Sequence, residues 1–180
     1  VGGTRPLGTT VLIEDVAFHI ENLPEATHDL QQMLRKHGYD DACIYGHALE
    51  GNYHFIIAQS FDTQEQVDKY KNLMLEVEKL VVDKYDGSLK AEHGTGRNMA
   101  PFVKTEWGEK AFDVMRKVKN LFDPHNLLNP GVIFNDDPEC FVKNVKPLPL
   151  TNPLVDRCIE CGFCEVNCLT CGFTVSSRQR

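Results

Sequence analysis

The chain has 180 residues, of which 42% are hydrophobic and 25% are charged, and its formal net charge is −7. These values are typical of a globular domain with a real core and leave room for a small appendage. No basic cluster favours nucleic acid, and no apolar run is long enough to span a bilayer. The first ten residues contain neither an initiator methionine nor a signal-peptide pattern, so we expect a piece of a longer chain.

Strand patterns and helix patterns alternate through the first half of the chain. The expected strands are residues 10–20, 43–47, 53–60 and 88–94, and the expected helices are residues 23–37 and 67–81. A turn at residues 48–52 joins the second and third strands into a hairpin. The order βαββαβ predicts an α+β, ferredoxin-like fold, in which an antiparallel sheet carries its helices on one face.

A further helix is expected over residues 106–122. It should end there because Asp123 precedes Pro124, and the residue before a proline disfavours the helical conformation. Its predicted inner face consists of Trp107, Ala111, Met115, Val118 and Leu121. Residues 135–157 are rich in proline and have little periodicity. We therefore predict a globular domain at 1–134, a linker at 135–157 and a cysteine-rich segment at 158–180.

Five of the seven cysteines lie between Cys158 and Cys171. A disulfide framework would spread them through the fold, so the clustering favours a metal or iron–sulfur site in a reducing compartment, and we expect a cytoplasmic protein. Four of them have the C-x2-C-x2-C-x3-C spacing of bacterial [4Fe–4S] ferredoxins: Cys158, Cys161, Cys164 and Cys168. A four-thiolate zinc site is the alternative, and Cys171 offers a second choice of outer ligand.

The stretch GHALEGNYH places His47 and His54 on either side of the hairpin turn, so strand pairing brings the two imidazoles close. The fourth strand would add Glu92 and His93 to the same region. Two histidines and a carboxylate are a divalent-metal set, and His93 would serve as a base if the glycines after it bend the chain. Exposed, hydrogen-bonding histidines are the alternative interpretation, and a hydrolytic zinc site fits the same spacing.

Four stretches carry a family resemblance: GHALEGNYH, KAEHGTGR, FDPHNLLNPGVIF, and CIECGFCEVNC with SSRQR just after it. In this order they resemble the C-terminal domain of FAD-linked oxidases and the iron–sulfur extension of its bacterial members. The family includes glycolate oxidases, D-lactate dehydrogenases and D-2-hydroxyglutarate dehydrogenases. The resemblance covers essentially the whole chain. It implies that residues 1–134 are the substrate (cap) domain, that 158–180 begin a 4Fe-4S segment, and that the FAD-binding half lies elsewhere.

The resemblance implies an FAD-dependent D-2-hydroxyacid dehydrogenase, with D-lactate as the favoured substrate. The positions that match His47, His54 and Glu92 bind a divalent metal (Zn, Mn or Fe), which holds the substrate's carboxylate and 2-hydroxyl. The position that matches His93 takes the hydroxyl proton while the α-hydrogen leaves as hydride to the flavin. Asn52 and Asn129 are expected in the wall that faces the flavin.

The resemblance also implies an electron path through the iron–sulfur clusters to a quinone, cytochrome or ferredoxin-type acceptor. A homodimer and a peripheral position at the inner face of the membrane are compatible with it. This sequence departs from the family pattern at Glu50, where Asp is commoner, at Val132, which replaces Lys, and at Leu169, which replaces Pro. Arg5 is the one candidate near the start of the chain for the family's substrate-binding arginine.

Two rival functions remain open at this point. A metal-dependent hydrolase would use His47, His54 and Glu92 on the ferredoxin-like scaffold and would need no flavin. A non-catalytic iron–sulfur electron-transfer module would give His93 no role. If the FAD-dependent interpretation holds, the 180 residues alone are expected to show no turnover, because the flavin is bound by another domain.

Overall fold

The computed structural model describes residues 6–145, 150–158 and 162–173 of the chain. Three strands form one antiparallel sheet in the order β1-β3-β2, with β1 at Thr10–Ala17, β2 at Cys43–His47 and β3 at Asn52–Gln59. The longer helices are α1 (Leu23–Lys36), α2 (Gln64–Glu78, continued by a π-helical segment, Lys79–Lys84) and α3 (Val103–Phe122). Short 3-10 helices occupy Ile20–Asn22, Ala48–Glu50, Ala100–Phe102, Val155–Arg157 and Glu165–Asn167. The expected α+β class is confirmed.

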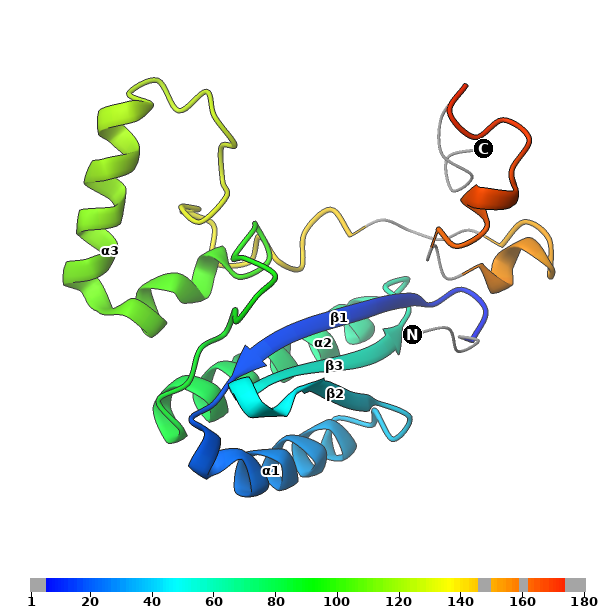
Figure 1. The fold of residues 1–180 in the computed structure, drawn as a ribbon, viewed down its shortest axis with the longest axis horizontal. Coiled ribbons are helices and arrows are strands. Elements are labelled where there is room, and N and C mark those ends of the chain that lie inside the picture. Colours follow the sequence, from blue (N-terminus) through cyan, green and yellow to red (C-terminus); the bar gives the residue numbers. More distant parts are fainter. Residues whose placement is uncertain (1–5, 146–149, 159–161, 174–180) are drawn as a thin grey trace.

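The core lies between one face of the sheet and the helices α1 and α2, which Figure 1 shows beside the three strands. Strand alternation and the pairing register place Val16, Phe55 and Ile57 on this face. They are buried in one cluster with Leu30 and Leu34 of α1 and Leu73, Met74 and Val77 of α2. Because the helices cover one face only, the opposite face of the sheet is left for other contacts.

The predicted hairpin between β2 and β3 is present, and Gly51 closes its turn. Gly51 has a φ of 69°, and a Cβ at this position would lie 2.0 Å from the carbonyl oxygen of Phe18. The Gly51 carbonyl in turn accepts a 2.9 Å hydrogen bond from the Phe18 amide, which ties the turn to the chain leaving β1. Only glycine combines this backbone conformation with such a close approach.

The predicted fourth strand differs from the structure, which reduces it to one antiparallel bridge between Ser88 and Ala17 of β1. The amide groups beyond the bridge bond to side chains instead of to β1. The Leu89 amide donates to the Glu106 carboxylate at 3.0 Å, and the Glu92 and His93 amides donate to Asp15. The sequence predicted an extended strand here, but the amides of Leu89, Glu92 and His93 go to acidic side chains, so no ladder forms.

The inner face predicted for α3 is also wrong in part. Trp107 is 60% exposed and Leu121 is 77% exposed, and Val103 is the buried residue of this helix. Gly108 has non-helical dihedral angles and kinks the helix. Figure 1 shows α3 projecting away from the sheet. Periodicity identifies an amphipathic helix, but it does not identify what covers the apolar side.

Phe141 lies within the predicted linker, yet it is buried against Phe102 and Tyr70, with ring centroids 5.2 and 6.3 Å apart. The neighbouring Glu139 carboxylate pairs with Lys71 of α2. The proline content predicted an irregular backbone here. A single buried aromatic residue such as Phe141 produces no periodic pattern, so the sequence did not predict this contact.

None of the helices in the described part of the chain has both the length and the hydropathy required to cross a membrane.

Candidate functional site

The open face of the sheet carries a cluster of polar side chains. Asp15 of β1 pairs with His54 of β3, and His47 of β2 pairs with Asn52 of β3. Directly paired residues in an antiparallel sheet share a face, and alternation puts this face opposite the one that holds Val16 and Phe55. The strand pattern that builds the core therefore also directs two histidines, an aspartate and an asparagine to the side without helices.

Glu92 brings the two histidines of the hairpin together. Its Oε1 atom lies 2.8 Å from His54 Nε2 and 3.3 Å from His47 Nε2. Each of the three residues offers one donor atom, and these atoms lie within 4.8 Å of one another. The three residues that the sequence selected as metal ligands thus meet at one point, although Glu92 comes from a loop and not from a strand.

His93 lies beside this group and is 43% exposed at its side chain. Its ring stacks on His54 with the centroids 4.6 Å apart and an angle of 8° between the planes. Its Nε2 atom lies 3.9 Å from Glu92 Oε1. Glu92 and His93 would point to opposite sides of a regular strand, but the chain is not a strand here, so both side chains reach the same site.

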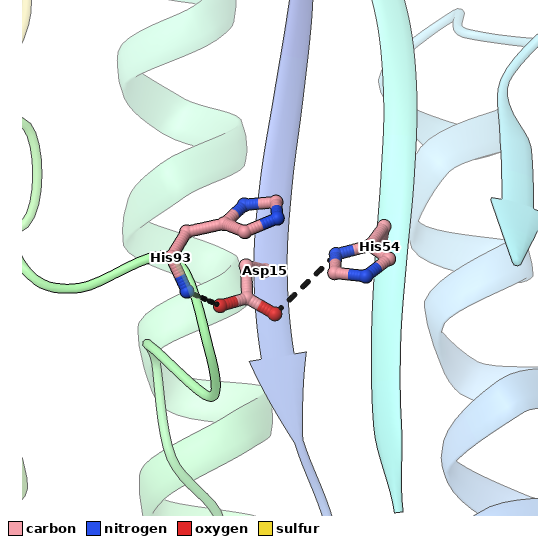
Figure 2. A group of neighbouring side chains, drawn as sticks. All are labelled: Asp15, His54 and His93. Atoms are coloured by element: carbon pink, nitrogen blue, oxygen red, sulfur yellow. Dashed lines mark hydrogen bonds and ion pairs between the residues drawn. The ribbon is translucent and has the colours of Figure 1, made fainter. Parts of the chain in front are cut away.

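Asp15 is the residue of this site that the sequence interpretation missed. It is fully buried, and Figure 2 shows it between His54 and the backbone nitrogen of His93. Burial raises the pKa of Asp15, but the backbone amides of His93 and Glu92 and the side-chain amide of Asn52 oppose this effect, and the net result lies below the ordinary value of 3.8. Asp15 is therefore ionised at neutral pH. Its signal in the sequence is a pair of acids, Glu14-Asp15, in the middle of a strand.

Glu14 points to the helix-covered face and anchors the loop that carries Glu92. Its carboxylate accepts hydrogen bonds from Tyr70 at 2.9 Å and Asn98 at 2.9 Å, and it forms an ion pair with Lys90 at 3.2 Å. Burial raises the pKa of Tyr70 well above 10, and the adjacent Glu14 charge adds to this effect, so the phenol stays protonated and donates. Two adjacent acids of β1 thus hold the same loop from the two faces of the sheet.

A hollow of about 530 Å³ opens next to the histidine cluster. The residues that line it are Ala17, His47, Glu50, Asn52, Ser88, Lys90, Ala91 and Glu92. Its volume lies within the usual range for small-molecule sites. The two site residues His47 and Glu92 form part of its wall, so a small molecule in the hollow would lie against them.

Asn52, predicted to face the flavin, lies within this cluster and lines the hollow. Its side-chain amide donates to Asp15 at 2.6 Å and to the Val16 carbonyl at 3.2 Å, so these hydrogen bonds run into the sheet. Asn129 is exposed and has a φ of 46°, as expected of a turn residue.

Three of the four predicted cluster cysteines cap short helices. Cys158 ends the helix Val155–Arg157, and Cys164 and Cys168 flank the helix Glu165–Asn167. Cys161 lies outside the described residues, so the four thiols are not described as a set.

Comparison with known proteins places the chain in a family. Residues 3–133 match the model of the FAD linked oxidases, C-terminal domain. The chain belongs to this family. Glycolate oxidase subunit GlcD of Bacillus subtilis is 28% identical over 135 residues, which cover 73% of this chain and 27% of that protein.

Two further relatives carry other names. D-2-hydroxyglutarate dehydrogenase of Escherichia coli is 35% identical over 132 residues, which cover 73% of this chain and 12% of that protein. The mitochondrial D-lactate dehydrogenase [cytochrome] 1 of Saccharomyces cerevisiae is 31% identical over 124 residues, which cover 69% of this chain and 20% of that protein. The chain therefore spans about an eighth to a quarter of the length of these relatives.

Proposed function

We propose that this chain is the substrate-binding part of an FAD-dependent dehydrogenase of small D-2-hydroxyacids, with D-lactate as the favoured substrate. The observation that carries the proposal is the convergence of His47, His54 and Glu92 on one point, with His93 stacked beside them. The family membership and the names of the relatives support the flavin and the hydroxyacid class. We propose residues 1–134 as the substrate domain, 135–157 as its linker and 158–180 as the start of an iron–sulfur segment.

The residues fit a divalent cation. Two imidazole nitrogens and one carboxylate oxygen converge on one point. The ionised Asp15 adds negative charge beside them, because Lys90 of the same loop pairs with Glu14 and not with Asp15. Imidazole and carboxylate donors suit Zn, Mn and Fe, and three protein ligands leave positions open for a substrate. When bound, the cation supplies Lewis-acid polarisation of the substrate's hydroxyl, and FAD supplies the hydride acceptor.

His93 then acts on the substrate's 2-hydroxyl. Its Nε2 atom faces the same carboxylate oxygen as the two histidine ligands, so a hydroxyl held at that point lies within reach of it. Nε2 takes the hydroxyl proton, the C2 hydrogen leaves the substrate as hydride, and the product is a 2-oxo acid. Stacking against the buried His54 ring holds the His93 imidazole in the plane from which it accepts the proton.

The cysteine spacing supports a [4Fe–4S] cluster held by Cys158, Cys161, Cys164 and Cys168, which would carry electrons to a quinone, cytochrome or ferredoxin-type acceptor. This step is separable from the chemistry at His93. Replacing Cys164 by Ala is expected to stop electron transfer to an external acceptor while D-lactate still bleaches the flavin. Equal transfer rates in the variant would exclude the cluster from the path.

The test of the proposed reaction uses the full-length protein under anaerobic conditions. D-lactate, D-2-hydroxyglutarate and glycolate are offered in turn, and reduction of the flavin is followed by its absorbance. His93→Ala is expected to abolish flavin reduction and to retain bound FAD, while His125→Ala, which changes an exposed histidine of the turn after α3, is the matched control with the wild-type rate. Unchanged reduction in His93→Ala, or no reduction by any of these hydroxyacids in the wild type, would contradict the proposal.

A further inference from the structure

We propose that Asp15 is the positioning residue of this site, and that one buried carboxylate fixes His54, Glu92 and His93 relative to one another. The inference rests on the proposed cation site. It adds a residue that touches neither substrate nor cation and acts through the groups that do.

One carboxylate oxygen of Asp15, Oδ2, holds the loop. It accepts hydrogen bonds from the backbone amides of Glu92 at 2.7 Å and of His93 at 2.8 Å, which are consecutive residues. Two consecutive amides that point at one oxygen turn the chain, so the side chains of Glu92 and His93 leave the backbone on the side of the cluster. This contact replaces the strand ladder that the sequence predicted for the same residues.

The other oxygen, Oδ1, faces His54 of the hairpin. Oδ1 accepts the Asn52 amide at 2.6 Å and lies 3.4 Å from His54 Nδ1. His54 Nδ1 is buried and makes no closer polar contact within the described part of the chain, so the Asp15 carboxylate is the group that faces it. A cation held beside Glu92 would take the Nε2 lone pair of His54, so the ring proton would stay on Nδ1, where the Asp15 carboxylate faces it.

The inference predicts a large effect from a small change. Asp15→Asn keeps the size of the side chain but turns one oxygen into a donor, which then faces either the amides of Glu92 and His93 or the His54 ring. Loss of such a supporting carboxylate typically weakens metal binding about 10- to 100-fold.

Asp123→Asn is the matched control. Asp123 is also buried, and its carboxylate also accepts two consecutive backbone amides, those of Leu127 and Leu128 at 2.8 Å, but it lies at the end of α3 and not in the metal site. Any loss of affinity that arises from removing a buried carboxylate in general would appear in both variants.

The experiment titrates metal-free full-length protein with Co²⁺ and follows its visible absorption, with Zn²⁺ competition to give the affinity. Asp15→Asn is expected to bind about 10- to 100-fold more weakly and to show an altered Co²⁺ spectrum, while Asp123→Asn stays within about threefold of the wild type. Wild-type affinity and spectrum in Asp15→Asn would overturn the inference and leave the cation site standing. Absence of Co²⁺ and Zn²⁺ binding in the wild type would instead overturn the proposed site, and the inference with it.

A second measurement needs no variant and therefore does not depend on whether Asp15→Asn folds. Hydrogen exchange of the metal-free wild-type protein is expected to be slower at the amides of Glu92 and His93 than at the exposed Gly94, because Asp15 accepts both. Exchange of these two amides at the rate of Gly94 would show that Asp15 does not hold the loop.

Discussion

The buried ion pair between Glu14 and Lys90 gives the sharpest stability prediction. The side chains of Glu14 and Lys90 are 3% and 12% exposed, so the pair is largely shielded from water. Removal of one partner from a buried pair costs about 3–5 kcal/mol. Glu14→Gln keeps an oxygen for Tyr70 and Asn98, and Lys90 retains some contact with water. We therefore expect the lower end, a loss of about 3 kcal/mol in the free energy of unfolding.

Urea unfolding of the full-length protein and its variants, followed by near-UV circular dichroism, measures this loss as a lower midpoint with an unchanged slope. The double variant Glu14→Gln/Lys90→Met separates the pair from its surroundings. Each single change leaves the other partner without its counter-charge. The two single losses of unfolding free energy should therefore sum to more than the loss in the double variant, by about 1–3 kcal/mol. A loss below about 1 kcal/mol in Glu14→Gln, or additive effects in the cycle, would refute the claim that this pair anchors the loop to the sheet.

Three further predictions concern the frame that carries the site. Phe55→Ala removes a fully buried ring from the helix-covered face and should cost about 3–5 kcal/mol in urea unfolding, with Co²⁺ affinity unchanged if His54 indeed faces the other way. Gly51→Ala forces a Cβ against the Phe18 carbonyl and should lower the melting temperature by several degrees; an unchanged melting temperature would contradict the close approach. Lys119, together with the backbone amides of Leu127 and Leu128, lowers the pKa of Asp123 from 3.8 to about 2, so the stabilisation from this carboxylate is complete above pH 3.8 and is lost as the pH falls towards 2. The difference in melting temperature between wild type and Asp123→Asn should therefore vanish over that interval, and a constant difference would count against the ion pair.

Much of the frame could be predicted because its signals are local. Alternation in β1 and β3 separates core residues such as Phe55 from site residues such as His54, and the turn between β2 and β3 follows from its glycine and asparagine. These local patterns were sufficient to place His47 and His54 together. The positions of Glu92 and His93 in the same site were anticipated from the strand order, although the expected strand is a loop.

The remaining features depend on contacts between residues distant in the sequence. Asp15 lies 77 residues before Glu92, and no local pattern indicates that its carboxylate captures that backbone. The same limit explains why the predicted fourth strand is a loop, since a strand pattern does not reveal that side chains will take its amides. The exposed apolar residues of α3 likewise follow from what surrounds the helix and not from its own spacing.

Anaerobic flavin reduction by D-lactate in metal-free and metal-reloaded full-length protein tests the central claim most directly. If His47, His54 and Glu92 hold a cation that binds the hydroxyacid, removal of the metal abolishes flavin reduction, and Zn²⁺ or Mn²⁺ restores it in the wild type but not in His54→Ala. Flavin reduction at the full rate in metal-free protein, or restoration in His54→Ala, would contradict the account.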